Sequence, residues 1–176
     1  MAVIINASTS TGLVQSADTS GIIQFQSNGS TKATLGPSGF SYPGGVLQVV
    51  SQQAPANYTS TSSALTLLTQ SFTPTSATSK VLAFMSYVVE RNGGNSGNYI
   101  FVLFKRNGAT LESQWGNASG YQETSGARAV ATHTYLDSPA TTSAISYTIV
   151  GDFSAGGAGV PWQFYTFQLT LMEIAA

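Results

Sequence analysis

Short apolar runs separated by turn-forming residues recur through most of the chain. From residue 46 onward they predict eight β-strands, at residues 46–52, 64–72, 80–91, 98–106, 110–115, 127–136, 144–153 and 162–174. Asn-Gly, Gly-Gly and Asp-Ser-Pro sequences lie between the runs, and these favour turns. No segment has the apolar period or the abundance of helix formers that is typical of a long helix. The pattern therefore predicts an all-β domain at residues 46–176, folded as an eight-stranded antiparallel jelly-roll sandwich.

The first 45 residues are organised differently, as shorter and more widely separated runs. Strands are expected at residues 3–5, 13–15, 22–26 and 31–35, and the last two are joined by Asn28-Gly29, a strong signal for a β-hairpin. Gly- and Pro-rich segments at residues 36–39 and 43–45 then indicate a linker. Because a hairpin of this size is only marginally stable alone, residues 1–45 are predicted to be an arm that needs a partner.

Two of the predicted strands are apolar on both faces. At residues 81–89 both alternating sets of side chains are almost entirely apolar, and the same is true of residues 99–104. A strand with one wet face should alternate cleanly, so these strands are expected to be covered on both sides. One cover is the sandwich core, and the other is most simply a second copy of the chain; a loop folded over a monomer remains the alternative. The candidates for the core or a trimer interface are Leu82, Phe84, Met85, Tyr87, Tyr99, Phe101, Leu103, Phe167 and Leu169, and the sequence does not decide which alternating set faces the partner.

Charge is scarce, and this removes several classes of partner. Only 7% of the residues are charged and the formal net charge is −1, whereas 24 Ser and 21 Thr supply uncharged polarity. A nucleic-acid-binding surface or a polybasic membrane patch needs clustered Lys and Arg, so neither partner is expected. The apolar runs are too short for a membrane helix. The N-terminus lacks the basic residues of a secretory signal, so synthesis in a cytoplasm is expected.

The sequence also offers little for catalysis. Cysteine is absent and His133 is the only histidine, which argues against thiolate or zinc sites and against a recognisable catalytic triad. The carboxylates include Glu90, Asp137 and Asp152 at strand ends, where turn capping is the plainer interpretation. Aromatic residues such as Trp115 and Trp162 could stack on sugars, although core or interface positions are more common. We therefore expect no enzyme activity, no cofactor and no metal.

Several short sequence motifs resemble those of known phage virion proteins. Residues 13–39 resemble the β-rich leader of tailed-phage fibre-like and head-associated proteins. A larger resemblance, to the C-terminal jelly-roll domain of phage virion proteins including those of cyanophages, is carried by residues 79–82, 104–108, 134–143 and 169–176. Its more specific motifs are Tyr-Leu-Asp-Ser-Pro at residues 135–139 and Leu-Met-Glu-Ile at residues 171–174. Such domains are trimeric jelly rolls used as capsid decorations, head fibres or fibre tips, and they carry no catalytic residues.

This resemblance implies a function as well as a fold. It suggests a homotrimeric capsid decoration, or cement, protein that lies on the exterior of the virion and binds the major capsid protein. The arm would then be the anchor, and its candidate anchoring residues are Val3, Ile4, Ile5, Ile22 and Phe25. The alternative is a tail-fibre or fibre-tip receptor-binding protein whose partners are tail proteins and host surface glycans. A short arm without a heptad repeat favours the decoration protein.

Overall fold

The chain is described from a computed structural model, which covers residues 20–37, 39–54, 58–60, 64–91, 100–114, 128–153 and 162–176. Every regular element in these ranges is a β-strand, so the predicted all-β class is confirmed. The chain divides into two compact units, Met1–Pro43 and Gly44–Ala176.

The smaller unit is a three-stranded antiparallel sheet in the order β1-β2-β3. Its strands are β1 (Ile23–Ser27), β2 (Ser30–Gly36) and β3 (Gly39–Ser41). Asn28 and Gly29 form the two-residue loop of the predicted hairpin, with φ of 49° and 73°. Positive φ at both positions gives the turn the twist of the flanking strands, which explains why Asn-Gly occurs here. The third strand was not predicted, and the strands expected at residues 3–5 and 13–15 lie outside the described residues.

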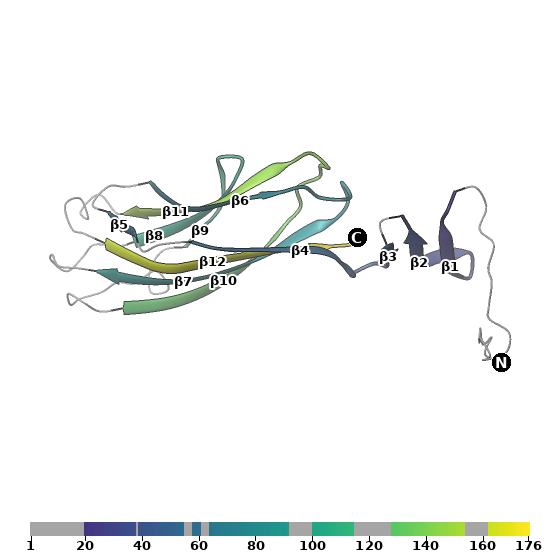
Figure 1. Cartoon of the computed structure of the whole chain (residues 1–176), viewed down its shortest axis with the longest axis horizontal. Helices are drawn as coiled ribbons and strands as arrows, with labels where there is room; N and C mark the ends of the chain where they lie inside the picture. Colours follow the sequence, from purple (N-terminus) through teal and green to yellow (C-terminus); the bar gives the residue numbers. More distant parts are fainter. Residues whose placement is uncertain are drawn as a thin grey trace. The chain divides into compact units, whose positions relative to one another are not determined.

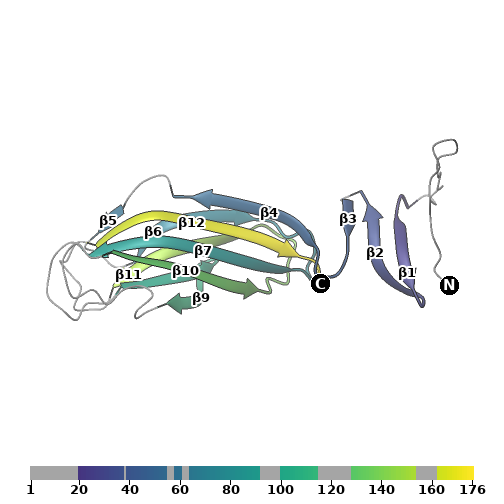
Figure 2. The ribbon, with the colours of Figure 1, turned by 90° about the horizontal axis from the view of Figure 1, so that it is seen from below.

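The larger unit is a sandwich of two antiparallel sheets, seen as two layers in Figure 1. One sheet has the order β10-β7-β12-β4, and these strands form the near layer in Figure 2. The other has the order β6-β11-β8-β9. The strands are β4 (Val46–Gln53), β6 (Leu65–Phe72), β7 (Lys80–Arg91), β8 (Ile100–Arg106), β9 (Ala109–Gln114), β10 (Arg128–Asp137), β11 (Ile145–Phe153) and β12 (Trp162–Ile174). A short additional strand, β5 (Tyr58–Ser60), pairs with the start of β12 and was not predicted.

The connectivity of these strands is that of a jelly roll. The first of the eight long strands pairs with the last, β4 with β12, and the pairing continues inward as β6 with β11, β7 with β10 and β8 with β9. A chain folded once on itself and then rolled gives this nested order, with alternate pairs in opposite sheets. The predicted eight-stranded jelly roll is confirmed.

The core lies between the two sheets and decides which face of β7 points inward. Val81, Ala83, Met85, Tyr87 and Val89 are at most 3% exposed and form the inner set of β7. They pack with inner residues of the other strands: Leu67, Leu68, Phe72, Val102, Phe104, Ile145, Tyr147, Ile149, Phe164, Phe167, Leu169 and Leu171. The other set of β7 therefore points away from the sandwich.

Candidate functional site

The outer face of the β10-β7-β12-β4 sheet is built from cross-strand rows of uncharged side chains. The strand register places Leu136, Leu82, Met172 and Val49 in one row and Thr134, Phe84, Thr170 and Ser51 in the next. A third row holds Thr132, Ser86, Gln168 and Gln53, and a fourth holds Val130, Val88 and Tyr165. We call these four rows the neutral face. Charged residues occur beyond its ends, with Lys80 past the first row and Glu90 past the fourth.

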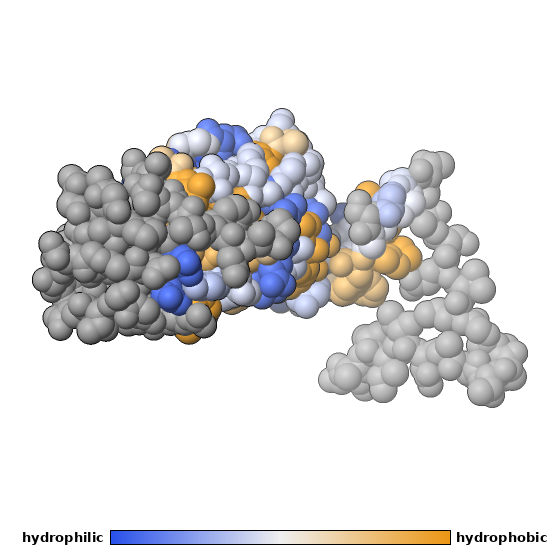
Figure 3. Space-filling model, turned by 60° about the vertical axis from the view of Figure 1, so that its left-hand side comes forward, coloured by the Kyte–Doolittle hydropathy of each residue, from blue (hydrophilic) through white to orange (hydrophobic). Residues whose placement is uncertain are grey.

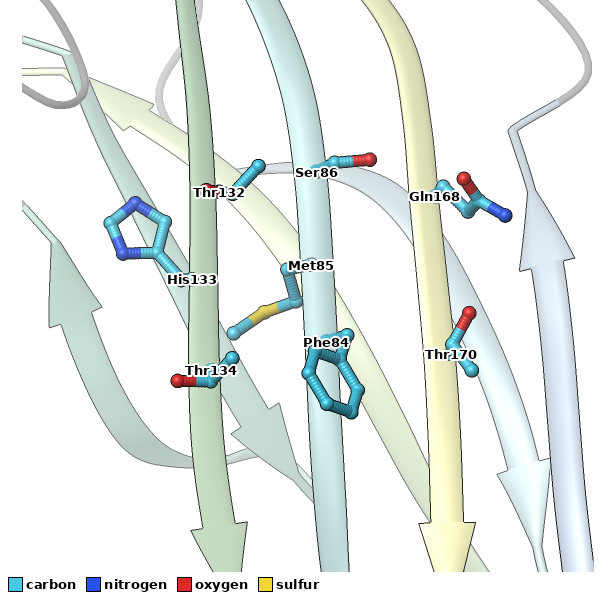
Figure 4. A pocket seen from close by; sticks show the side chains of 8 residues that line it. All are labelled: Phe84, Met85, Ser86, Thr132, His133, Thr134, Gln168 and Thr170. Carbon is cyan, nitrogen blue, oxygen red and sulfur yellow. The ribbon is translucent and has the colours of Figure 1, made fainter.

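Several large apolar side chains of the neutral face are exposed. Leu136 and Val49 are each 54% exposed, Phe84 is 42% exposed, and Val130 reaches 75%. Beside Phe84 lies a hollow of about 250 Å³, lined by Met85 and His133 and by Phe84, Ser86, Thr132, Thr134, Gln168 and Thr170. Figure 4 shows these residues on the adjacent strands β10, β7 and β12. The hollow thus combines one aromatic ring with hydroxyl and amide groups and has no charged side chain in its lining.

The outer face of the opposite sheet has a different character. Its rows are dominated by hydroxyl groups, for example Thr69 beside Thr148, whose oxygens are 3.4 Å apart, with Lys105 in the same row. The exposed large hydrophobic residues in the described part of the larger unit all lie on β4, β7 or β10: Val46, Val49, Phe84, Val130 and Leu136. The two outer faces are therefore unequal, and the uncovered apolar surface lies on one of them.

The arm carries a second apolar surface. Register places Ile23, Phe25, Ala33, Leu35 and Phe40 on one side of its sheet. The rings of Phe25 and Phe40 meet edge to face at 5.8 Å, and Phe40 also contacts Tyr42. Phe25, Leu35, Phe40 and Tyr42 are all more than 40% exposed, and Figure 3 shows apolar residues gathered on this unit as an orange patch. A sheet normally covers its apolar side with a second layer, and the described residues of the arm form one layer only.

His133 on β10, the only histidine, is paired with the inner residue Met85, is half-buried, and contributes to the lining of the hollow described above. Its Nε2 shares a hydrogen bond of 2.9 Å with the hydroxyl of Tyr87, and the two rings stack at 5.6 Å. Burial lowers the pKa of His133, and the nearby Glu112 carboxylate offsets only part of this effect. Burial, assisted by Glu112, raises the pKa of Tyr87. The pair is thus held neutral, which suits a polar contact between a buried tyrosine and a half-buried histidine.

Glu173 lies at the far end of β12 and is fully buried, where it binds the loop between β6 and β7. Its carboxylate accepts hydrogen bonds from the hydroxyl of Ser79 at 2.5 Å, from Nε2 of Gln48 at 2.6 Å and from the backbone N–H of Thr75 at 2.8 Å. Burial acts to raise the pKa of Glu173, but the hydrogen bonds from Ser79, Gln48 and Thr75 outweigh it and the pKa is lowered. The carboxylate in the Leu-Met-Glu-Ile motif, that of Glu173, therefore has a structural role.

Asp137 has a similar part at the end of β10. The guanidinium of Arg106 forms an ion pair with it at 2.8 Å, and the hydroxyl of Tyr147 donates a hydrogen bond of 2.6 Å. The backbone N–H of Ser138 also binds it at 2.8 Å, which is the local turn cap expected from the sequence. Burial and the bond to Asp137 raise the pKa of Tyr147. Asp137 thus joins the two sheets, because β10 belongs to one and Arg106 and Tyr147 to the other.

The predicted interface and core residues fall into distinct groups. Met85, Tyr87, Phe167 and Leu169 are buried in the protomer's own core. Leu82 and Phe84 lie on the neutral face, and Leu103 is half-buried on the outer side of the opposite sheet. Phe101 is on β8, but its side chain lies outside the description, as do Tyr99 and the predicted anchoring residues Val3, Ile4 and Ile5. The other two anchoring candidates, Ile22 and Phe25, are exposed on the arm.

The sequence alone did not identify Val49, Val130, Leu136 or Met172 as members of one surface. Their strands are far apart in the chain, and only the register of the jelly roll brings them into rows. Apolar residues at alternate positions of strands that are otherwise rich in Thr and Ser are the sequence pattern that could have identified these four residues.

Two further kinds of feature are missing from the residues that the structure describes. These residues include no group of three or more His, Asp or Glu side chains that could hold a metal ion. They also contain no helix with the length and apolar character needed to cross a membrane.

Comparison with known proteins gives a match in structure only. No protein-family model and no curated protein matches the sequence. Among solved structures, that of infectious bursal disease virus Gt strain has 16% identity and a TM-score of 0.46, covering 98% of this chain and 47% of that one. The T13 viral particle of the same virus has 16% identity and a TM-score of 0.49, covering 84% of this chain and 35% of the other. The VP2 subviral particle of this virus has 14% identity and a TM-score of 0.46, covering 84% of this chain and 37% of the other. The chain thus spans less than half the length of these neighbours, and identity and overlap at this level bear on neither its function nor its partners.

Proposed function

We propose that this chain is a virion structural protein, a homotrimeric decoration protein that binds the outside of a phage capsid. The observation that carries the proposal is that the described residues of each of its two units expose an apolar surface. The neutral face lies on the jelly roll, and the other surface lies on the arm sheet. A chain with two separate apolar surfaces is suited to join two kinds of neighbour, its own copies and a larger assembly.

The arm is the anchoring unit in this proposal. Its apolar side offers Phe25, Leu35, Phe40 and Tyr42, which are rigid or bulky groups of the kind that dominate protein interfaces. The outer strands β1 and β3 also present free sheet edges among the described residues, so strand addition to a capsid protein could supply main-chain hydrogen bonds. Neither mode of binding needs charge, which agrees with a chain that is 7% charged.

The buried ionisable groups are consistent with a structural rather than a chemical role. Glu173 and Asp137 hold loops and strand ends, and His133 is paired with the buried Tyr87. The motifs that resemble those of phage virion proteins include two of these residues, Asp137 and Glu173, and both have structural contacts. This supports a jelly roll maintained for its stability and its surfaces.

The test is binding of the purified full chain to virions that lack it. We expect saturable co-sedimentation with heads, and density above the capsid lattice in electron cryomicroscopy. The matched variants are Phe40→Ser, on the apolar side of the arm, and Gln24→Ser, on the opposite side; only the first should weaken binding. Density confined to the tail would favour the alternative, a receptor-binding fibre tip. Absence of the protein from purified virions of its phage would overturn the proposal.

A further inference from the structure

We propose that the neutral face is the surface through which copies of this chain associate, with two further copies as its occupants. The inference rests on the proposed function for the number of copies, and it adds which of the jelly roll's surfaces they share. The first argument is the inequality of the two outer faces. Exposed large hydrophobic residues of the described jelly roll occur on the neutral-face sheet, whereas the opposite face presents threonine and serine hydroxyls, Lys105 and the half-buried Leu103. Covering the first face removes apolar surface from water, and covering the second would gain much less.

The second argument is charge. In a symmetric assembly each side chain near the axis meets its own copies, so a charged residue there would face like charges. The four rows of the neutral face hold no charged side chain, and Lys80 and Glu90 occur only beyond its ends. A different protein as occupant would need no such neutrality, and its binding would gain from charges on the surface. The absence of charge across these rows therefore favours a contact between copies of this chain over a contact with a different protein.

The third argument is the shape of the neutral face. Thr132 and Thr134 line the hollow, whereas Val130 and Leu136, which precede and follow them on the same side of β10, are the protruding apolar residues. The surface thus offers both a depression and protrusions beside it. Apolar groups of one copy can enter the hollow of the next, which would fix the register of copies on a sheet surface that is otherwise smooth.

The inference is tested with a matched pair of threonines, each at an exposed position on an edge strand of one of the two outer faces. Thr134→Asp places a carboxylate on the neutral face, and Thr69→Asp places one on the opposite face. We expect Thr134→Asp to weaken association of the full chain by about 100-fold, because the new charge would be buried without a partner, and Thr69→Asp to leave it unchanged. Light scattering during size-exclusion chromatography gives the mass, and circular dichroism checks the fold.

A second measurement does not require the face to tolerate a charge. The chain has no cysteine, so a single introduced thiol is the only one present. In the native oligomer a thiol at Thr134→Cys should react with a maleimide at least about tenfold more slowly than one at Thr69→Cys, because copies would cover it. Equal reaction rates in a chain that is trimeric would overturn the assignment.

The outcomes separate this inference from the proposed function. If both aspartate variants remain trimeric, the face is wrong while the homotrimer stands. If the unmodified chain is a monomer at micromolar concentration, both the face and the homotrimer are wrong. A chain that trimerises through the neutral face but does not bind virions would support this inference and overturn the decoration function.

Discussion

Gly151 on β11 lies directly against the ring of Phe164 on β12, where the inner faces of the two sheets meet. A Cβ added to Gly151 would stand 2.5 Å from Cζ and 2.9 Å from Cε1 of that ring. Phe164 is fully buried, and its ring also lies 5.7 Å from that of Phe167, so it has little room to move away. The glycine is therefore needed for close approach of the sheets.

We predict that Gly151→Ala lowers the free energy of unfolding by about 1–3 kcal/mol, the usual cost of overpacking a filled core. Chemical denaturation measures the change. Adding Phe164→Leu should make the combined loss smaller than the sum of the two single losses, because the smaller side chain relieves the clash. Strictly additive losses would show that the two residues do not compete for the same space.

The eight long strands of the jelly roll were predictable from the sequence because each is a short apolar run between turn residues. Residues 80–91 and 162–174 were predicted with the bounds that β7 and β12 have in the structure. Asn28-Gly29 was equally informative, because few residue pairs accept positive φ at both positions. Local chemistry is sufficient for such features.

The orientation of those strands was not predictable. In β7 both alternating sets are apolar, so pattern alone could not place Met85 inside and Phe84 outside. In β12 the register shifts between Tyr165 and Gln168, where Thr166 has a φ of 36°. This irregularity turns both Phe164 and Phe167 inward, although residues three apart in a regular strand point to opposite sides. The partners of Asp137 were hidden for a related reason, since Arg106 and Tyr147 reach it only across the sandwich.

Asp137→Asn should destabilise the jelly roll by about 2–3 kcal/mol, because it removes the charge that Arg106 and Tyr147 bind while leaving their polar atoms in place. The side chain of Asp137 is 6% exposed and that of Arg106 is 28% exposed, so solvent screens the pair only in part. Tyr147→Phe removes one hydrogen bond and should cost less, about 1 kcal/mol. Thermal unfolding of both variants tests this order; a larger loss for Tyr147→Phe would contradict it.

Glu173 predicts a loss of stability in acid. Its pKa is lowered in the folded chain, so the folded state binds fewer protons than the unfolded state as the pH falls below the ordinary value of 4.5. The stabilisation is present above that value and is lost as the pH falls through the folded pKa. Glu173→Gln should cost about 3 kcal/mol at neutral pH and should show a smaller further loss in acid. Parallel acid profiles for the two proteins would exclude this role of Glu173.

His133 predicts a second loss of stability on acidification, which begins at a higher pH than the loss caused by Glu173. Its pKa lies below the ordinary value of 6.5 in the folded chain, so the unfolded state takes up the proton first as the pH falls. Stability is therefore complete above that value and decreases as the pH falls toward the folded pKa. We expect the melting temperature to fall between about pH 7.5 and pH 5.5, and to fall less in His133→Gln, which cannot be protonated. A variant that loses as much over this range would show that another group titrates.

A chain that begins at Gly44 should keep the fold and the self-association of the full chain but lose binding to virions. The cut preserves the two backbone hydrogen bonds that join the start of β4 to the C-terminus, from Gly44 N–H to the carbonyl of Ala175 and from Ala175 N–H to the carbonyl of Gly45, both 2.8 Å. It also preserves the whole compact unit Gly44–Ala176 and its core. What it removes is the arm sheet with its apolar side, the proposed anchor. Melting temperature and mass should therefore match those of the full chain, whereas co-sedimentation with virions lacking the protein should fall to background. If the shortened chain binds as tightly as the full one, the anchoring surface lies on the jelly roll and the arm has another role.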